Sequence, residues 1–214
     1  MTTPIIVLGS GGHARVVLDV LRLLGREIVG LTTEDRALFG SDVFGCRVLG
    51  SDEALAAYAP EQVRLVNAIG SAHSMDARKS LFEKIRARGF AFAQVIHPSA
   101  IIARDAVLGE GVHVMAGAVL QPGVSVGANT IVNTRASVDH DCMIGAHVHI
   151  APGCTLSGNV SVGDDSHIGA GATIIQGRHI GKRCLVAAGA VVIHGVMDGE
   201  RVAGVPAHRM RKRV

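Results

Sequence analysis

His140 stands between two carboxylates in the segment Val138-Asp139-His140-Asp141. An imidazole beside a carboxylate can be oriented by it and kept basic near neutral pH, which is what a general base requires. The segment therefore offers a group that could remove a proton from an attacking nucleophile. A solvated surface histidine between two aspartates has the same local sequence, so the segment alone leaves both interpretations open.

The glycine-rich turn Gly9-Ser10-Gly11-Gly12-His13 is a second candidate. It follows the apolar run Ile5-Ile6-Val7-Leu8 and precedes a segment with helical spacing of apolar residues. Backbone N–H groups placed in this way at a helix N-terminus can hold a phosphate. Ala14 replaces the last glycine of the dinucleotide fingerprint GxGxxG, and a tight strand-to-helix turn without a ligand stays open as the alternative.

These two candidates lie in different kinds of sequence. From Ile96 to Val192 every sixth residue is Ile, Leu or Val, seventeen times in succession. A period of six fits neither an amphipathic helix nor an isolated strand, and it indicates a hexapeptide β-helix. The residue four places on is usually small, so we expect the aliphatic side chains to fill the interior and the small ones the corners. Glycine often follows the aliphatic residue, as at Gly109 and Gly127, where we expect it to relieve strain at the turn.

Three hexapeptides make one triangular coil, so residues eighteen apart should stack on neighbouring coils. Gly158 is then expected directly over His140. A glycine at that place leaves its backbone N–H open to a ligand. This N–H could stabilise the oxyanion of a tetrahedral intermediate.

The same arithmetic places His113, His149 and His167 in one column. The γ-class carbonic anhydrases, which are also β-helices, bind zinc through histidines, so a metal enzyme stays open as an alternative. Ile131 interrupts the column, however, and no acidic or cysteine ligand joins it, which is poor for tetrahedral ligation. We therefore expect no metal.

The N-terminal part alternates expected strands with expected helices, which predicts a small Rossmann-like parallel α/β sheet. We expect strands over residues 5–8, 27–31, 64–69 and 91–95, and helices over residues 14–24, 52–58 and 77–88. The predicted domains are residues 1–95, which would bind a ligand through the glycine-rich turn, and residues 96–214, which form the β-helix with a C-terminal tail. A dehydrogenase is disfavoured because only a β-helix follows the α/β domain.

Composition narrows the function classes. The formal charge of +3 over 214 residues is too small to indicate nucleic-acid binding, and no apolar stretch approaches the length of a membrane span. We expect a soluble cytoplasmic protein. Cys142, Cys154 and Cys184 occupy the small inward place of the repeat, so we expect buried packing thiols. The basic tail could meet a phosphate; it comprises Arg209, Arg211, Lys212 and Arg213.

Four motifs together carry a family resemblance over essentially the whole chain: GSGGHA after the first strand, HPSA at the domain junction, VNTRASVDHDCMIGAHVHIAPG in the coils, and GVPA near the end. The chain resembles bacterial sugar acyltransferases, which include sialic acid O-acetyltransferases and acetyl-CoA-dependent N-acetyltransferases of nucleotide-linked 4-amino-4,6-dideoxy sugars. Among these it looks most like the GDP-perosamine N-acetyltransferases. The resemblance implies a left-handed parallel β-helix, a homotrimer with sites between chains, and acetyl-CoA as co-substrate.

The resemblance also implies roles for individual residues. His140 would be the general base, Asp141 its supporting acid, and Gly158 the oxyanion donor. The expected acetyl-CoA-binding positions are His149, Gly158, Ala170, Ala188 and Arg209. The expected nucleotide-sugar-binding positions are Gly9, Ser10, Gly11, Gly12, His13, Thr33 and Asp35, where the last two stand at the end of the second strand in place of the aspartate pair common in the family.

The implied reaction is direct transfer of an acetyl group to the C4 amine of a GDP-linked or UDP-linked amino sugar. Three alternatives stay open. The acceptor could be a hydroxyl group, as in a sugar or sialic acid O-acetyltransferase. The protein could be a metal enzyme of the γ-carbonic-anhydrase kind, or a non-catalytic scaffold that binds a nucleotide sugar and trimerises through its β-helix.

Overall fold

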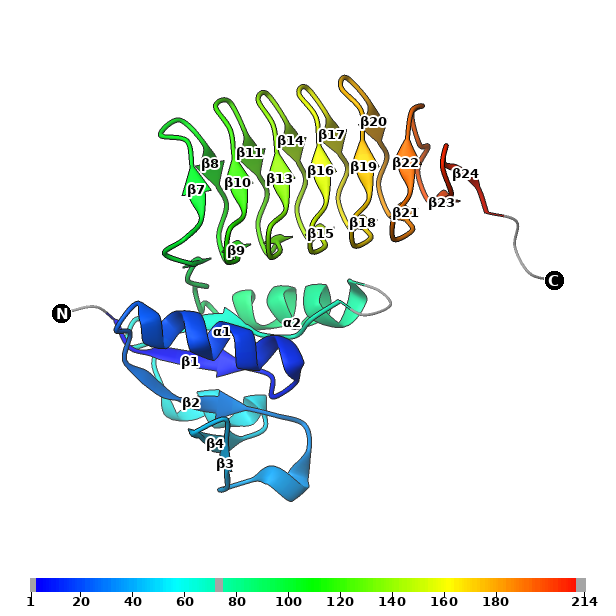
Figure 1. Cartoon of the computed structure of the whole chain (residues 1–214). Helices are drawn as coiled ribbons and strands as arrows, with labels where there is room; N and C mark the ends of the chain where they lie inside the picture. Colours follow the sequence, from blue (N-terminus) through cyan, green and yellow to red (C-terminus); the bar gives the residue numbers. More distant parts are fainter. Residues whose placement is uncertain (1–2, 72–74, 211–214) are drawn as a thin grey trace. The chain divides into compact units, whose positions relative to one another are not determined.

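The structure, a computed structural model, describes residues 3–71 and 75–210 (Figure 1). It divides after Pro98 into two compact units. The helices within the described ranges are all too short or too polar to cross a membrane.

The N-terminal unit is built on one five-stranded sheet in the order β3-β4-β2-β1-β5. All neighbouring strands run parallel except β3 and β4, which form an antiparallel hairpin. The strands are β1 (Ile5–Leu8), β2 (Ile28–Thr32), β3 (Asp42–Val43), β4 (Cys46–Gly50) and β5 (Arg64–Asn67), and the short strand β6 (Val95–Ile96) follows later in this unit. The helices are α1 (Gly12–Leu23), η1 (Arg36–Leu38), η2 (Asp52–Ala57) and α2 (Asp76–Arg86).

The central strand β1 is fully buried on both faces, as expected for a strand inside a parallel sheet. Helix α1 buries one apolar face that includes Val17, Leu18 and Leu21. Because β1, β2, β4 and β5 run parallel, their carboxyl ends meet at one edge of the sheet. The loops that follow these strands are therefore the expected place for a ligand in a sheet of this kind.

The expected Rossmann-like sheet is confirmed, with differences in detail. The segment expected as a helix over residues 52–58 is the 3₁₀ helix η2. The β3–β4 hairpin was not expected, because β3 has only two residues and the apolar–polar–apolar alternation of β4 covers only Cys46 to Val48. In place of a full strand over residues 91–95, the structure has a single bridge between Leu65 and Phe92 followed by β6.

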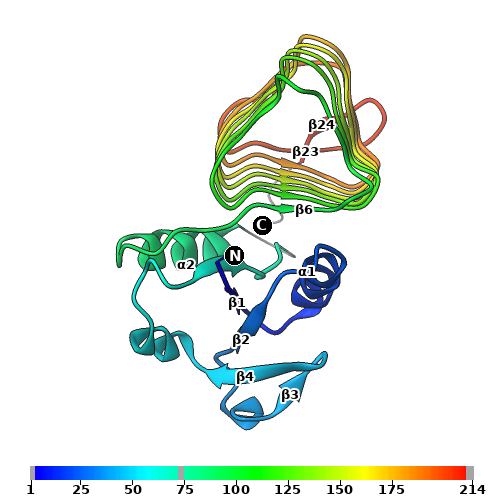
Figure 2. The ribbon, with the colours of Figure 1, turned by 90° about the vertical axis from the view of Figure 1, so that its left-hand side faces the viewer.

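The C-terminal unit is a parallel β-helix of triangular coils, seen end-on in Figure 2. One sheet, called the first sheet below, contains β7 (Ile101–Ile102), β10 (Val119–Leu120), β13 (Ser137–Val138), β16 (Thr155–Leu156), β19 (Thr173–Ile174) and β22 (Val191–Val192). The second contains β8 (Val107–Leu108), β11 (Ser125–Val126), β14 (Met143–Ile144), β17 (Ser161–Val162) and β20 (His179–Ile180). The strands that the C-terminal unit contributes to the third sheet are β9 (His113–Val114), β12 (Ile131–Val132), β15 (His149–Ile150), β18 (His167–Ile168), β21 (Leu185–Val186), β23 (Arg201–Ala203) and β24 (His208–Arg209).

The predicted stacking of residues eighteen apart is confirmed by the strand register. Val138, for example, pairs with Leu120 on one side and Leu156 on the other. These aliphatic side chains are at most 1% exposed, so they form the interior of the prism. The small residues of the repeat, such as Ala136 and Cys142, are also completely buried.

The repeat places glycine for two different reasons, and our expectation for one of them was wrong. Gly127 was expected to relieve backbone strain, yet its φ is not positive. A Cβ there would lie 2.5 Å from the backbone N of Ala146 on the next coil, so glycine is needed for close approach of the coils. The positive φ falls two places further on, at every sixth residue from Gly111 to Gly189, where glycine alternates with residues such as Asp141 and Asn159.

The cysteines are buried free thiols, as expected. Burial raises the pKa of the Cys154 thiol to about 11, and it also raises the pKa values of Cys142 and Cys184. A thiol with a raised pKa is a poor nucleophile near neutral pH. These residues therefore pack the prism interior.

Candidate active site

His140 and Asp141 form a hydrogen-bonded pair at the corner between β13 and β14. The His140 Nδ1 lies 2.9 Å from Asp141 Oδ2, and its backbone N–H donates to Asp139 Oδ1 over 2.8 Å. A carboxylate acceptor requires the proton on Nδ1, which leaves the Nε2 lone pair free to accept a proton. The hydrogen bond that His140 donates to the Asp141 carboxylate is the main reason that the pKa of His140 is raised above its usual value. Both side chains are exposed.

Gly158 lies directly against the His140 ring, as the stacking predicts. A Cβ on Gly158 would lie 2.5 Å from His140 Nε2, so any side chain there would displace the imidazole. No group within the described residues accepts a hydrogen bond from the Gly158 N–H. Gly158 is buried under the ring. The two residues thus place a base and an uncommitted N–H donor at one corner.

Gly123 completes this corner and was not singled out from the sequence. It lies one coil before Asp141, and a Cβ there would approach Asp141 Oδ1 to 2.6 Å, so the glycine leaves room for the carboxylate. Asp141 itself adopts a φ of +58°, which aspartate tolerates better than most residues. The spacing of eighteen residues between Gly123 and Asp141 was the signal that could have revealed this contact.

His149 lies on the third sheet rather than at the His140 corner. Its side chain is only 8% exposed, and its Nε2 lies 3.0 Å from Asn133 Nδ2. Its ring meets the His167 ring edge-on, with centroids 4.9 Å apart. Burial lowers the pKa of His167. A largely buried imidazole such as His149 can line a binding site but is a weaker candidate for the base than the exposed His140.

The predicted histidine column is present, with Ile131 paired between His113 and His149 in the strand register. Throughout the described ranges, no three His, Cys, Asp or Glu side chains gather in a way that could hold a metal ion. In this column Ile131 separates His113 from His149, whereas His149 and His167 are direct neighbours.

Ala170 and Ala188 are both exposed and lie on neighbouring coils at the corner where the third sheet turns into the first. The Ala170 carbonyl accepts a hydrogen bond from the Gly189 N–H over 2.9 Å. His140 lies at a different corner, between the first and second sheets. The structure of one chain therefore brings together His140, Asp141 and Gly158, and it places the alanines along another edge of the prism.

Arg209 lies in β24, where its Nε is 3.5 Å from Glu200 Oε1. Its side chain is 76% exposed. An anion that bound Arg209 would have to compete with this carboxylate. The other basic residues of the tail, Arg211, Lys212 and Arg213, lie outside the described residues.

In the N-terminal unit, Gly9 to Gly11 link β1 to α1, and Gly12 and His13 form the first turn of α1. Among the described residues, no side-chain cap hydrogen bond is made at Gly11, the N-cap of α1. A Cβ on Gly11 or Gly12 would contact nothing within 4 Å. This open helix N-terminus can accept an anion.

The end of β2 is tied to this turn. Ser10 Oγ lies 2.7 Å from Thr33 Oγ1, which also accepts the backbone N–H of Asp35 over 3.2 Å. The Asp35 carboxylate caps η1 by accepting the Ala37 N–H over 3.0 Å. The structure therefore brings Thr33 to the glycine-rich turn, while it uses the Asp35 carboxylate within its own loop.

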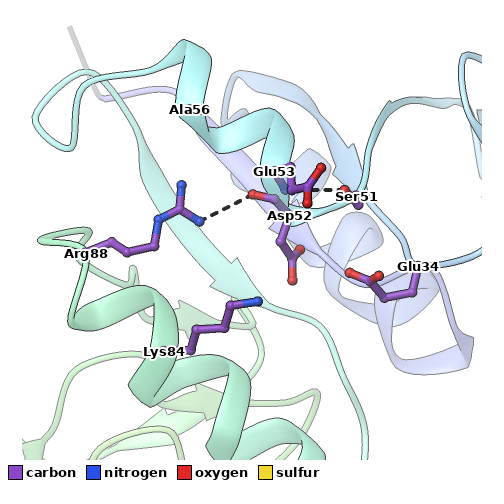
Figure 3. A pocket seen from close by; sticks show the side chains of 7 residues that line it. All are labelled: Glu34, Ser51, Asp52, Glu53, Ala56, Lys84 and Arg88. Atoms are coloured by element: carbon purple, nitrogen blue, oxygen red, sulfur yellow. Dashed lines mark hydrogen bonds between the residues drawn. The ribbon is translucent and has the colours of Figure 1, made fainter.

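A cleft of about 410 Å³ opens beside the end of β2 (Figure 3). The cleft is lined by acidic and basic side chains together with two uncharged ones. The lining residues are Glu34, Ser51, Asp52, Glu53, Ala56, Lys84 and Arg88. Thr32 Oγ1 donates to Asp52 Oδ1 over 2.6 Å, and Arg88 donates to the Asp52 carbonyl over 3.4 Å. The cleft offers hydrogen-bond donors and acceptors but, among the residues that line it, Ala56 alone is apolar.

Comparison with known proteins matches two family models to the chain. Residues 4–85 match the PglD N-terminal domain, and residues 159–193 match the hexapeptide repeat of succinyl-transferase. No curated protein sequence matches the chain.

Several solved structures match almost the whole chain. The acetyltransferase domain of PglB from Neisseria gonorrhoeae FA1090, also solved with acetyl coenzyme A, is 37% identical over 98% of this chain and 100% of that one, with a TM-score of 0.89 for the first of the two structures. A histidine-to-asparagine mutant of perosamine N-acetyltransferase from Caulobacter crescentus, in complex with CoA and GDP-perosamine, is 37% identical over 99% of both chains, with a TM-score of 0.92. WeeI from Acinetobacter baumannii AYE is 26% identical over 98% of this chain and 100% of that one, with a TM-score of 0.81.

Proposed function

Since the chain belongs to the sugar N-acetyltransferase family that joins a PglD N-terminal domain to a hexapeptide β-helix, we propose that it acetylates the C4 amine of a nucleotide-linked 4-amino-4,6-dideoxy sugar with acetyl-CoA. GDP-perosamine is the favoured acceptor, and a UDP-linked amino sugar is the next. The similarity to perosamine N-acetyltransferase over nearly all of both chains supports this choice. The observation that carries the proposal is the His140–Asp141 pair stacked against Gly158.

In the proposed reaction, His140 acts as the general base. The amine nitrogen attacks the thioester carbonyl carbon while His140 Nε2 accepts a proton from the amine. An ammonium ion has no lone pair for this attack, so the proton must leave before or during it. Asp141 holds the ring and stabilises the imidazolium that forms, in line with the raised pKa of His140.

The tetrahedral intermediate carries a negative charge on the former carbonyl oxygen. The uncommitted N–H of Gly158 is the proposed donor to this oxyanion. When the C–S bond breaks, the sulfur of CoA leaves and takes the proton from His140. The thiols of Cys142, Cys154 and Cys184 are buried inside the prism, so direct transfer without an acyl-enzyme is proposed.

The ligands are assigned to different units. The open N-terminus of α1, with Gly9 to His13 and the neighbouring Thr33, is proposed to hold the nucleotide diphosphate. Acetyl-CoA is proposed to lie along the β-helix, with His149, Ala170 and Ala188 beside the acetyl group and the pantetheine arm, and Arg209 near the 3′-phosphate.

A homotrimer with active sites between chains is part of the proposal. His140 lies at one corner of the prism, whereas Ala170 and Ala188 lie at another, so a second chain can bring the two sets together. Sedimentation at micromolar concentration tests this assembly. A stable monomer with full activity would contradict it.

The reaction itself is tested by mixing the protein with acetyl-CoA and a panel of acceptors, and by following the release of free thiol. The panel contains GDP-perosamine, a UDP-linked 4-amino-4,6-dideoxy sugar and sialic acid. We expect thiol release with an amino sugar nucleotide, accompanied by an amide product in the mass spectrum. If sialic acid were the only acceptor of the panel that gave turnover, the proposed N-acetylation would be wrong and the protein would be an O-acetyltransferase.

A further inference from the structure

Arg78 of helix α2 is a charged side chain that is completely buried. Its guanidinium donates to the carbonyls of Asn67 and Ile69, the latter over 2.8 Å. Asn67, which is only 1% exposed, donates its side-chain amide back to the Arg78 carbonyl over 2.8 Å. The side-chain oxygen of Asn67 also accepts the Ile69 N–H over 3.3 Å. These hydrogen bonds fix the backbone that leaves the carboxyl end of β5.

The segment fixed in this way, residues 68–70, packs against the glycine-rich turn. A Cβ on Gly9 would lie 3.3 Å from Ile69 Cγ1 and 3.4 Å from the carbonyl carbon of Ala68. A Cβ on Gly70 would lie 3.4 Å from the Cβ of His13. The Ala68 N–H donates to the Leu8 carbonyl over 2.8 Å, one residue before Gly9. The position of this segment therefore sets the position of the turn.

We propose that Arg78 is a positioning residue for the nucleotide diphosphate: it clamps residues 68–70 so that the N–H groups between Gly9 and His13 are held ready for the phosphates. This inference rests on the proposed function, since it deepens the assignment of the diphosphate to that turn. Arg78 acts through the backbone of residues 68–70 and is not itself assigned a contact with the ligand.

An arginine buried for a purely structural role at this position would carry a large desolvation cost. Burial lowers the pKa of Arg78 to about 9, which reflects the cost of removing a cation from water, although the side chain still carries its proton at neutral pH. Well-packed apolar residues often stabilise a protein more than a buried charge does. Both carbonyls accept from the same guanidinium nitrogen, Nη1. Its two N–H bonds lie in the guanidinium plane at a fixed angle, whereas the three N–H bonds of a lysine ammonium are tetrahedral and rotate about the side chain. We therefore infer that Arg78 fixes the backbone position of residues 68–70 more accurately than an apolar residue would, at some cost to the stability of the folded protein.

The experiment compares Arg78→Lys with wild type by calorimetric titration of GDP, UDP and acetyl-CoA, and by steady-state kinetics. Lysine keeps the charge but loses the fixed planar pair of N–H bonds that Nη1 directs at the two carbonyls. We expect the Kd of the nucleoside diphosphate that the wild type binds to rise about 10-fold, the effect of roughly one lost hydrogen bond to a charged group. The Kd of acetyl-CoA should stay within about twofold, and KM for the sugar nucleotide should rise while kcat is retained, which is the pattern of lost uniform binding.

Two further variants make the result decisive. Ile69→Ala keeps Arg78 and removes the contact with Gly9, so it should weaken the nucleoside diphosphate in the same direction even where Arg78→Lys fails to fold. Arg64→Lys, at the other end of β5, is the matched control and should bind every ligand as the wild type does. Unchanged diphosphate affinity in Arg78→Lys, or an equal loss for acetyl-CoA, would overturn the inference alone. A wild type that binds neither GDP nor UDP would overturn the proposed function together with it.

Discussion

In the β-helix, His140 and Gly158 meet because they are one coil apart in a regular repeat, whereas in the N-terminal unit Gly9 meets Ile69 only through the packing of separate strands. In a repeat with a fixed number of residues per coil, the spacing in the sequence determines which residues stack, so a single register sets every contact along a column. A parallel sheet places its loops through crossover connections of varied length. The comparison teaches that the geometry of the His140 corner follows from the spacing of the repeat, while the geometry of the glycine-rich turn depends on contacts between distant parts of the sequence.

The largest expected effect tests the proposed catalytic role of the His140 corner. His140→Asn should lower kcat by about 10²–10⁴-fold, which is the usual contribution of a general base. The Kd values of acetyl-CoA and of the sugar nucleotide should change little, because the exposed ring contributes to proton transfer rather than to packing. Thiol release under saturating conditions measures the change. A variant that keeps more than about a tenth of wild-type turnover would place the base elsewhere.

A substitution in the glycine-rich turn tests the proposed diphosphate site of the N-terminal unit. Gly11→Val should raise the Kd of the sugar nucleotide by about 10-fold or more, since a branched side chain keeps the phosphates away from the helix N–H groups. The fold should tolerate the change, because a Cβ on Gly11 contacts nothing within 4 Å and its backbone is extended. Calorimetry should show acetyl-CoA affinity nearly unchanged. The reverse pattern would contradict the assignment of the ligands to the two units.

A stability experiment compares the same substitution in the two regions. Gly127→Ala should destabilise the protein by about 1–3 kcal/mol, because the added Cβ would overlap the backbone of the next coil. Gly12→Ala should stabilise it slightly or leave it unchanged, since the space is open and alanine favours helix. Denaturant unfolding gives both values. Equal effects at the two positions would show that the coils can separate more easily than the structure indicates.

Asp141→Asn should have a smaller effect on turnover than the loss of His140, roughly 10-fold, because the carboxylate orients the ring and tunes it. Its hydrogen bond raises the pKa of His140, so its removal lowers that pKa. The base must be neutral to work, and activity is therefore lost as pH falls through this pKa. The acid limb of kcat/KM against pH should move to lower pH in the variant, and an unmoved limb would mean that another group controls it.

The smallest effect is expected for the tail. Removal of residues 209–214 should weaken acetyl-CoA binding a few-fold at low salt, because an exposed arginine contributes little to affinity. Arg209 already pairs with Glu200, which reduces what a phosphate can gain there. The difference from wild type should shrink as salt is raised. If the loss of acetyl-CoA affinity did not depend on salt, the tail would contribute through a contact that is not electrostatic.

The sequence predicted the β-helix in detail and the N-terminal unit in outline. The aliphatic period gave the coils, the buried cysteines and the stacking of Gly158 on His140, because each follows from a fixed spacing. The β3–β4 hairpin was not predicted, since β3 has only two residues and the alternation in β4 covers only Cys46 to Val48. The reason for glycine after the aliphatic residue, as at Gly127, was predicted wrongly. Spacing alone does not distinguish a glycine that is needed for a positive φ from one that is needed for close approach of the coils.

The candidate site divides in the same way. His140, Asp141 and Gly158 could be predicted from the repeat and the family resemblance. Arg78 could not be singled out, because a charged residue on an amphipathic helix is ordinarily exposed, and its burial depends on the loop after β5. The capping role of Asp35 was also not predicted, since it depends on the 3₁₀ helix η1, which no sequence pattern indicated.

The register of the β-helix also determines which insertions and deletions the molecule can accept. Side chains on each strand alternate between interior and surface, so loss of one residue within a strand would turn the aliphatic residues of that strand outward. Loss of a full coil of eighteen residues beyond Gly158 would instead shorten the prism and keep every remaining residue in phase. Length variation in such a chain should therefore occur in whole coils or in loops at the corners, while the His140 corner keeps its geometry.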